Sequence, residues 1–376
     1  MEIFGDTYLK VDLDKIRKNI VNLKKFSKNS KFCLVAKADA YGLGDGVVAK
    51  EVEDLVDYFA VSRVDEGILL RKNNIKKPIF VLGYVDIQEL TGCEKFDIGI
   101  TIYDYDYAKK INENLNKKLN CHIAIDSGHG RIGFRNFEID KILKLKNLEK
   151  LDCVGIFSHF ATADEDDITY TKYQYDYFLD VVDKVKDNFP KIITHISNDA
   201  GLIKHKILCD MVRCGISVYG IYPSDVLRKE NEIELFEAFE LKSTISFVKE
   251  IYKGDYISYG RTFRAEKKMK VATVSIGYAD GYSRSFSNLG EMSLNGHKCR
   301  VLGRVCMDQL MIDVTGLDAK IGDKVSVYPD IYEEAEKIGT IVYELMTNIS
   351  KRVPRIYYKD EKVCKRVNYN LQIENE

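Results

Sequence analysis

The chain lacks an excess of either charge, and it lacks any long apolar run. Its 376 residues contain 57 Lys and Arg against 58 Asp and Glu, a formal net charge of −1. A chain so balanced has no global basic field that would attract nucleic acid or an anionic membrane. No apolar run approaches the length of a membrane span, and the first residues do not resemble a signal peptide. We therefore expect no nucleic-acid partner, no membrane partner and a cytoplasmic location.

Metal-ligand spacings are also missing. The nine cysteines are odd in number, scattered, and contain no C-x-x-C pair. This usage indicates reduced thiols in a cytoplasm and argues against a disulfide framework or a zinc site. The six histidines show no H-E-x-x-H or comparable spacing, so we expect no structural metal. No internal repeat or low-complexity tract is present either.

What the chain does have is a lysine at the end of a buried strand. Residues 32–36 are continuously apolar, as in a parallel strand covered on both faces, and Lys37 follows directly. An amine in a partly dry pocket loses its proton easily and can form a Schiff base with an aldehyde. The turn with Gly42, Gly44 and Gly46 can bring backbone N–H groups close to an anion. A lysine that can form a Schiff base next to a turn that can bind a phosphate indicates a site for pyridoxal 5′-phosphate (PLP). A surface lysine after a strand explains this stretch equally well.

The N-terminal part of the chain repeats a strand–helix pattern. A short strand over residues 8–13 precedes a helix that we expect Asp14 to cap. Eight further strand-like runs, with helical segments between them, follow at residues 32–36, 58–62, 78–82, 98–102, 121–126, 153–158, 192–197 and 211–216. Eight such units in roughly 200 residues favour a (β/α)8 barrel over a doubly wound sheet. Barrel chemistry lies where the strands end, and five polar residues fall there: Lys37, Asp126, His159, Asn198 and Arg213.

A second domain is predicted from about residue 236. Residues 241–248 alternate between apolar and polar, and the runs near 271–276, 298–304 and 324–327 are strand-like with glycine turns. We expect a fold of class α/β, with a barrel over residues 1–235 and a mainly β domain over residues 236–376. The first ten or so residues can pair with the β domain. The polar residues 370–376 are expected to fray.

The motifs, taken in order, resemble those of the PLP-dependent alanine racemases. Residues 35–42 are similar to that family's PLP-lysine motif, and residues 125–133 are similar to its D-x-G-x-G-R-x-G segment. Further matches follow in the family's order at residues 155–161, 212–216, 257–260, 276–281, 303–308 and 352–355. Each is weak alone, but the ordered set spans some 320 residues. The resemblance implies a barrel plus β domain, and a head-to-tail homodimer in which the partner's β domain completes each active site.

The resemblance also implies a two-base racemisation. Removing an α-proton and returning one to the opposite face needs a base on each face. Lys37 would serve the face of the D-amino acid, and Tyr259 of the other subunit the face of the L-amino acid. A tyrosine pKa near 10 is too high for an efficient base at neutral pH, and each unit of lowering takes about 1.36 kcal/mol. Arg131 and His159 match residues that would supply this stabilisation.

The other matched positions bind the cofactor and the substrate. Arg213 matches an arginine that donates to the pyridine nitrogen without protonating it, which keeps the ring a weak electron sink. Cofactor-phosphate positions are matched by Tyr41, Gly215, Ile216 and Tyr343, with Asn198 and Asp199 beside them. Met307 and Asp308 match residues at the substrate carboxylate, Met307 through its backbone N–H. Tyr278 and Tyr343 match aromatics that keep the substrate entrance small.

Three positions depart from the family pattern. Ala124 stands where many relatives carry a carbamylated lysine that braces the equivalent of Arg131, so a bound anion or another side chain must do this, or Arg131 is less well fixed. Asp199 replaces a common serine on the cofactor phosphate. A carboxylate there would repel the phosphate, so we expect it to turn away and to leave only its backbone N–H in the cradle. Leu43 replaces a frequent histidine.

The leading function that the resemblance implies is therefore that of an alanine racemase, whose D-alanine would serve bacterial cell-wall synthesis. A racemase for serine or a larger amino acid stays open because of the three departures. A barrel-plus-β PLP decarboxylase is disfavoured because such enzymes place an acid where Arg213 stands. A non-catalytic PLP-binding barrel would need neither Tyr259 nor a β domain. A dinucleotide enzyme is weaker still, since residues 42–46 lack a third glycine at the Rossmann spacing.

Overall fold

The computed structural model describes residues 5–369, which divide into two compact units. We call residues 15–40 and 44–237 the barrel unit, and residues 5–14, 41–43 and 238–369 the β unit. Within residues 5–369, none of the helices combines the length and apolar character that a membrane crossing requires.

The barrel unit is built on eight parallel strands in the order β8-β7-β6-β5-β4-β3-β2-β9. These are β2 (Lys31–Val35), β3 (Tyr58–Val61), β4 (Ile79–Val81), β5 (Ile98–Ile102), β6 (Leu119–Ala124), β7 (Leu151–Phe157), β8 (Ile193–His195) and β9 (Met211–Cys214). The first strand, β2, pairs with both β3 and β9. Between β8 and β9, the Arg213 N–H donates to the Ser197 carbonyl at 3.0 Å. The predicted eight-stranded barrel is confirmed.

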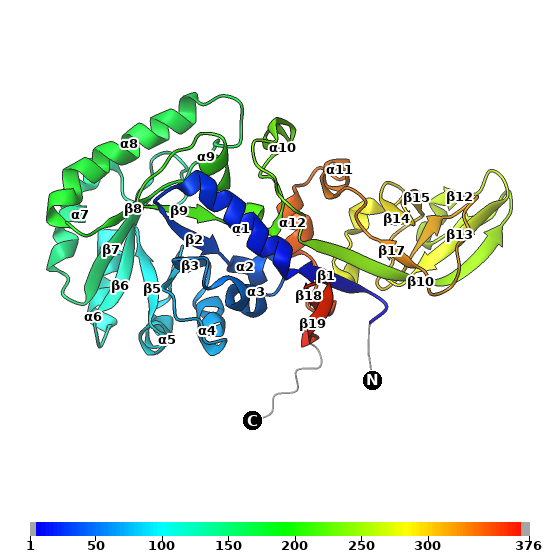
Figure 1. Ribbon diagram of the computed structural model, residues 1–376, viewed down its shortest axis with the longest axis horizontal. Helices are drawn as coiled ribbons and strands as arrows, with labels where there is room; N and C mark the ends of the chain where they lie inside the picture. The colour runs from blue at the N-terminus through cyan, green and yellow to red at the C-terminus, as the bar shows by residue number, and fades with distance from the viewer. Residues whose placement is uncertain (1–4, 370–376) are drawn as a thin grey trace. The chain divides into compact units, whose positions relative to one another are not determined.

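Helices surround these strands on the outside (Figure 1). They are α1 (Leu13–Ser27), α3 (Asp45–Val52), α4 (Val64–Lys72), α5 (Leu90–Phe96), α6 (Tyr105–Asn114), α7 (Ile139–Lys144), α8 (Thr169–Val185), α9 (Asp199–Ile203) and α10 (Asp225–Glu230). The strands read as apolar runs because both of their faces are covered, and all of β5 is buried. Asp14 does not cap α1 as expected: the helix begins one residue earlier, and the Asp14 carboxylate accepts from the Asp360 N–H at 2.7 Å.

The β unit is a mainly antiparallel sheet with two short helices. Its strands run in the order β13-β16-β15-β14-β17-β10-β1-β18-β19, and β13 also pairs with β10. They are β1 (Tyr8–Asp12), β10 (Phe239–Ile251), β13 (Met269–Val274), β14 (Glu291–Leu294), β15 (His297–Leu302), β16 (Leu310–Asp313), β17 (Lys324–Ser326), β18 (Arg355–Lys359) and β19 (Lys362–Val367). The pair β11 (Tyr256–Ile257) and β12 (Phe263–Arg264) and the helices α11 (Ile331–Lys337) and α12 (Val342–Thr347) complete the unit. The predicted mainly β C-terminal part is confirmed.

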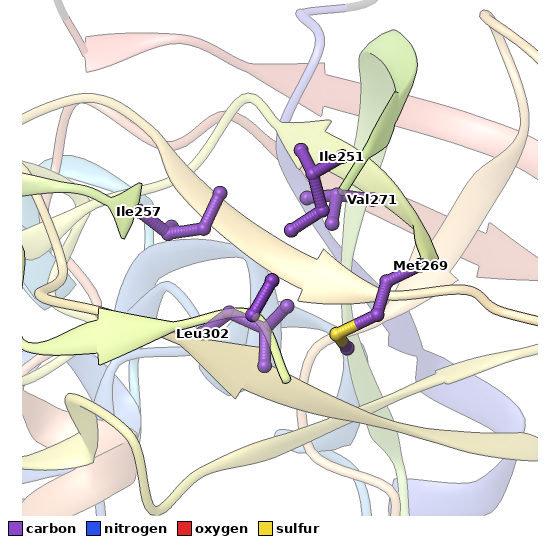
Figure 2. Packing of buried hydrophobic residues seen from close by; sticks show 6 residues of the cluster. Ile251, Ile257, Met269, Val271 and Leu302 are labelled. Carbon is purple, nitrogen blue, oxygen red and sulfur yellow. The ribbon is translucent and has the colours of Figure 1, made fainter. Parts of the chain in front are cut away.

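Alternation along β10 explains the core of the β unit. Along its first seven residues, buried and partly exposed positions alternate, so one face packs inward. A buried cluster lies against the far end of this strand, formed by Ile251, Ile257, Ala265, Met269, Val271 and Leu302 (Figure 2). Burying one side chain of this size contributes about 1.5–3 kcal/mol. This core supports the loops around residues 257–260 and 302–308.

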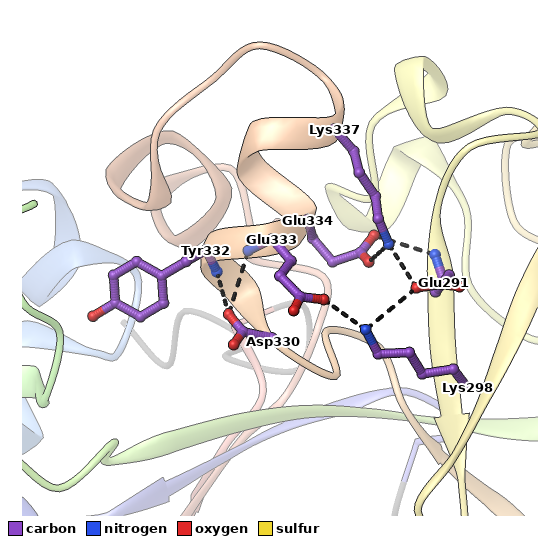
Figure 3. Close-up of polar contacts among 7 residues, drawn as sticks. All are labelled: Glu291, Lys298, Asp330, Tyr332, Glu333, Glu334 and Lys337. Carbon is purple, nitrogen blue, oxygen red and sulfur yellow. Dashed lines mark hydrogen bonds and ion pairs between the residues drawn. The ribbon is translucent and has the colours of Figure 1, made fainter. Parts of the chain in front are cut away.

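An ion-pair network ties α11 to the β14–β15 hairpin (Figure 3). Lys337 contacts Glu291 at 2.7 Å and Glu334 at 2.5 Å, while Lys298 contacts Glu333 at 2.6 Å. The Glu334 side chain is almost fully buried, and burial raises its pKa although Lys337 opposes this. The network attaches α11 to the sheet. None of its residues is among the predicted active-site residues.

Candidate active site

Lys37 lies directly after the buried strand β2, at the start of a strained turn. The four residues after it have left-handed backbone angles, with φ between 51° and 58° from Ala38 to Tyr41. Each such residue costs roughly 1–2 kcal/mol when it carries a side chain, so the surrounding structure must enforce the turn. The Glu66 carboxylate does so in part, because it accepts the Ala38 N–H at 2.7 Å. The strained turn therefore fixes the place beyond β2 from which the Lys37 side chain extends.

The electrostatic surroundings make Lys37 a readier proton donor. Burial lowers the pKa of the Lys37 amine, the positive charge of Arg131 lowers it further, and Glu66 partly opposes this. The pKa of His159 lies well below its usual value because of burial and then because of Arg213, Arg131, His129 and Lys37, in that order. Lys37, Arg131 and Arg213 therefore act on one neutral imidazole, and the mouth of the barrel is rich in cations.

Arg213 is the most tightly held of these cations. It is 4% exposed on β9. Its Nη1 donates to His195 Nδ1 (2.8 Å) and to the His195 carbonyl (3.0 Å), and its Nη2 donates to the carbonyls of Ser158 (2.8 Å) and Ile196 (3.1 Å). Burial lowers the pKa of Arg213 to about 10, so it stays protonated at neutral pH. Within residues 5–369 its Nε–H has no acceptor, which leaves one fixed donor for a ligand.

A pair of buried histidines behind Arg213 was missed by the sequence reasoning. Arginine only donates, so His195 must accept at Nδ1, carry its proton on Nε2 and donate it to His122 Nδ1 at 2.9 Å. Burial lowers the pKa of His122 to about 3 and that of His195 well below its usual value, so both rings are neutral. The signal that could have found them is a histidine inside each of two apolar strands, β6 and β8.

The loop after β6 holds Arg131 without a side-chain partner. Asp126 accepts from the Gly128 and Gly130 N–H groups and pairs with Arg135, which shapes the loop. Within the described part of the chain, no residue is hydrogen-bonded or ion-paired to the Arg131 guanidinium, and Ala124 is buried beneath the loop's start. Among residues 5–369, therefore, no side chain of the same chain braces Arg131 by a hydrogen bond or an ion pair.

The cradle of N–H groups lies after β9 and not in the glycine turn. Around Gly42, Gly44 and Gly46 the expectation was wrong: the Gly44 N–H donates to the Asp39 carbonyl, and the Gly46 N–H to Asp45 Oδ1. Gly42 is required for another reason, since a Cβ there would lie 2.5 Å from the Met346 carbonyl oxygen. Gly215 and the 3-10 helix η5 (Ile216–Tyr219) instead direct N–H groups at Asp199.

Asp199 does not turn away as expected. Its carboxylate accepts from the Gly215 N–H at 3.0 and 3.2 Å and from the Ser217 N–H at 3.2 Å. Burial raises its pKa, and these N–H groups oppose the rise. The preceding residue, Asn198, uses its Oδ1 to accept from the Gly201 N–H at 2.9 Å and so caps α9.

The β unit carries the remaining predicted site residues on three adjoining loops. The Tyr278 N–H donates to the Cys306 carbonyl and the Ala279 N–H to the Met307 carbonyl, both at 3.0 Å. This approach requires Gly277, because a Cβ there would lie 2.3 Å from both carbonyl oxygens. The Ser258 hydroxyl donates to the Arg304 carbonyl at 2.6 Å, which brings the Tyr259 loop to the same place.

The side chains that these loops present are exposed in the single chain. Tyr259 is 69% exposed, Met307 53% and Tyr278 43%. Asp308 is paired with Arg352 at 2.9 Å, and Arg352 also contacts Asp280 at 3.1 Å. Asp308 is a predicted site residue, but its pairing with Arg352, and that of Asp280, was not predicted from the sequence.

Tyr41 and Tyr343 also meet within the β unit. Their ring centroids lie 6.0 Å apart. Nearby, the buried Leu43 gives its carbonyl to the Tyr357 hydroxyl at 2.9 Å. Within residues 5–369, no group of three or more His, Cys, Asp or Glu side chains is arranged to hold a metal ion.

A lysine at the end of the first strand of a (β/α)8 barrel, followed by an antiparallel β unit, defines a known class of two-part enzymes. The family model described as the alanine racemase N-terminal domain matches residues 11–223, and that of the C-terminal domain matches residues 238–357. The chain belongs to the alanine racemase family.

Individual alanine racemases are similar to this chain in sequence and in structure along nearly its whole length. The chain is 42% identical to an alanine racemase of Clostridium tetani over 379 residues, and 40% identical to one of Clostridium perfringens over 378; each comparison covers 96% of this chain and 98% of the relative. The structure of an alanine racemase of Clostridium difficile 630 is similar with a TM-score of 0.93 at 39% identity, covering 98% of this chain and all of that one. An alanine racemase of Bacillus anthracis, solved with bound L-Ala-P, gives a TM-score of 0.94 at 34% identity, covering 99% and 100%.

Proposed function

We propose that this protein is a PLP-dependent alanine racemase that interconverts L- and D-alanine with Lys37 and Tyr259 as its two bases. The observation that carries the proposal is the group of cations around His159: Arg213 Nη2 lies 3.3 Å from His159 Nδ1, and, besides burial, the charges of Arg131 and Lys37 also lower the pKa of this imidazole. Three cations around an uncharged imidazole favour anionic ligands, as an amino acid carboxylate and a phosphorylated cofactor both are. Membership of the alanine racemase family supports alanine as the substrate.

The residues of the barrel unit fit this cofactor. The Nε–H of Arg213 is a fixed donor suited to a pyridine nitrogen, and an arginine there does not give up its proton. Near the cradle, the Ser217 hydroxyl is buried and has no hydrogen-bond partner of good geometry within residues 5–369, as a phosphate-binding group would in a chain without ligand. We propose that Gly215, Ile216, Asn198, Asp199 and His159 belong to the cofactor site, together with Tyr41 and Tyr343.

When bound, the cofactor would take up the charge left on the α-carbon after a proton is removed. Lys37 would hold or take the proton on one face of the substrate. Its lowered pKa favours this role, because a larger fraction of the amine is neutral at a given pH. Arg213 and the histidines behind it would keep the donor to the ring in place without supplying a proton.

Tyr259 would act on the other face from the partner subunit. Its 69% exposure gives a single chain no enclosed environment for it, which supports a homodimer with shared sites. Arg131, Asp308 and Met307, the last through its backbone N–H, would bind the substrate. Tyr278, with Tyr343, would keep the substrate entrance small. The exposure of Met307 and Tyr278 on the same loops supports their inclusion.

We further propose a domain boundary between residues 235 and 236, two residues before the division into compact units at 237/238. Strand β1 pairs with β10 and β18, which supports assigning the first residues to the β domain. All nine cysteines are free thiols, in keeping with a cytoplasmic enzyme that supplies D-alanine for cell walls.

The direct test is proton NMR in heavy water with PLP, offering L-alanine, L-serine and L-lysine in separate samples and assaying chirality. We expect exchange of the α-proton and formation of the D-isomer with alanine. Lys37→Ala should abolish both, whereas Lys50→Ala, at an exposed lysine paired with Glu53, should change neither. Preference for serine or lysine would refute alanine as the substrate, and absence of exchange despite bound PLP would refute the racemase proposal.

A further inference from the structure

An anionic side chain of this chain already fills the N–H cradle after β9. Asp199 begins α9 just beyond β8, and Gly215 follows β9, so neighbouring strands bring the carboxylate and the N–H groups together. Asp199 is 7% exposed, and its two oxygens accept three hydrogen bonds from the N–H groups of Gly215 and Ser217. These contacts are the kind that a phosphate oxygen makes with backbone N–H groups.

A phosphate dianion cannot share this cradle with the carboxylate as it stands. Each N–H group has one proton to donate, and those of Gly215 and Ser217 are used by Asp199. Like charges also repel strongly where water is excluded. A serine at this position would add a donor to the phosphate, but Asp199 adds a competitor.

The Ser217 hydroxyl is a second sign that the cradle is incomplete without a ligand. It is fully buried, and within residues 5–369 it has no hydrogen-bond partner of good geometry, although it lies close enough to Asp199 to favour the ionised carboxylate. Buried hydroxyls in folded proteins are nearly always bonded. The cradle therefore offers one more donor, the Ser217 hydroxyl, which the Asp199 carboxylate does not bond with good geometry.

We propose that Asp199 is an internal stand-in for the cofactor phosphate: its carboxylate occupies the cradle in the cofactor-free chain and must release the Gly215 and Ser217 N–H groups before the phosphate binds. The inference rests on the proposed PLP function. It makes Asp199 a determinant of cofactor affinity that opposes binding, and it makes the cofactor-free barrel more stable than it would be with an empty cradle.

The test uses two opposite effects of one substitution. In cofactor-free Asp199→Ser, the N–H groups lose their acceptor, so the melting temperature should fall by about 2 °C or more. In the same variant the dissociation constant for PLP should fall at least about tenfold, followed by the absorbance of the lysine-bound cofactor. Asp199→Asn keeps the size and an acceptor oxygen, so it should fold well and still bind PLP more tightly.

The control is a buried carboxylate held in the same way elsewhere in the barrel unit. Glu94 accepts from the N–H groups of Asn116 and Lys117 at 2.6 and 2.8 Å. Glu94→Gln should lower the melting temperature of the cofactor-free chain without changing PLP affinity. Comparison of the two variants separates the general cost of removing a buried carboxylate from the effect of freeing the Gly215 and Ser217 N–H groups.

Inorganic phosphate gives a readout independent of PLP chemistry. Millimolar phosphate should raise the melting temperature of cofactor-free Asp199→Ser and leave that of the wild type unchanged. Equal stabilisation of both proteins would overturn the inference, as would an unchanged or weaker PLP affinity in both Asp199 variants. If no protein in the set forms the lysine-bound absorbance, the proposed function fails by itself, and the phosphate melts still decide whether Asp199 occupies an anion cradle.

Discussion

The two units hold their proposed functional residues in opposite ways. In the barrel unit, Arg213 is 4% exposed, and hydrogen bonds inside the unit hold both of its Nη atoms. In the β unit, Tyr259 is 69% exposed on a loop. A group that is buried and held by several hydrogen bonds is preorganised before any ligand arrives, whereas an exposed group acquires its working environment only when another surface covers it. The barrel thus holds its functional residues in fixed positions, and the β unit presents residues that a partner subunit would enclose in the proposed dimer.

The two units also differ in the charges that surround their proposed functional residues. The cations at the barrel mouth lie around a neutral histidine, and the nearby carboxylate of Asp199 is bonded to backbone N–H groups. In the β unit, the Arg352 cation contacts two carboxylates, those of Asp280 and Asp308. An anionic ligand is therefore attracted to the barrel mouth, whereas the acids around Arg352 offer no comparable excess of positive charge.

The largest effect is expected from mixing subunits that are inactive in different units. Lys37→Ala and Tyr259→Phe should each lower racemisation at least about 10³-fold, since each removes a base. After the two proteins are unfolded together and refolded, half of the dimers are hybrids. Each hybrid pairs an intact Lys37 with an intact Tyr259 in one of its two sites. Activity should recover to about one quarter of the wild-type value.

The control for this experiment mixes Lys37→Ala with the double variant Lys37→Ala/Tyr259→Phe, which contains no intact lysine and should stay inactive. If both bases came from one chain, the hybrid would hold no complete site. Absence of recovery in hybrids that form normally would therefore contradict sharing of sites between subunits.

A smaller effect concerns acid stability, which should distinguish the two units. His122 titrates near 6.5 in an unfolded chain and at about 3 in the fold, so the unfolded state binds protons first as the pH falls. Stability is therefore full above about pH 6.5 and is lost towards lower pH. At pH 5 the loss from this group is about 2 kcal/mol, and His159 and His195 add to it in the same direction.

Hydrogen exchange followed by mass spectrometry should show barrel peptides losing protection between pH 7.5 and pH 5 before peptides of the β unit, whose one histidine, His297, is exposed. His122→Phe is the variant to compare with the wild type. It keeps an aromatic ring where His122 stacks on Phe80, with ring centroids 4.1 Å apart, but it removes the titrating group. The variant should be less stable at pH 7.5 but lose less stability on acidification. An unchanged pH slope would contradict the role of His122.

Much of this organisation could be predicted from the sequence, for identifiable reasons. Runs such as residues 98–102 are apolar because parallel strands are covered on both faces, and alternation along β10 marks a sheet with one buried face. These are local patterns, and the sequence carries them directly. Lys37 was not decided by its own stretch, which fits a surface lysine equally well, but by the ordered set of motifs that resembles a known family.

What could not be predicted depends on contacts between distant segments. The turn after Lys37 looked like an anion cradle, but Asp39 and Asp45 take the Gly44 and Gly46 N–H groups. Asp199 was expected to avoid the cradle by a charge argument that assumed a bound phosphate. In the structure the same N–H groups are instead hydrogen-bonded to its carboxylate. His122 and His195 form their pair only because β6 and β8 converge on Arg213.

The smallest expected effects lie in the β unit's ion-pair network, where burial decides the outcome. Glu334 is 1% exposed and accepts from Lys337 and from the Glu291 N–H, so Glu334→Gln should cost about 1–3 kcal/mol in urea unfolding. Lys298 and Glu333 are each about half exposed, and Lys298→Met should cost less than about 1 kcal/mol. Salt at 1 M should remove the small effect of Lys298→Met and leave most of that of Glu334→Gln, because screening acts on exposed charges. Equal costs for the two variants would mean that the network contributes as a unit and that burial of Glu334 adds nothing to it.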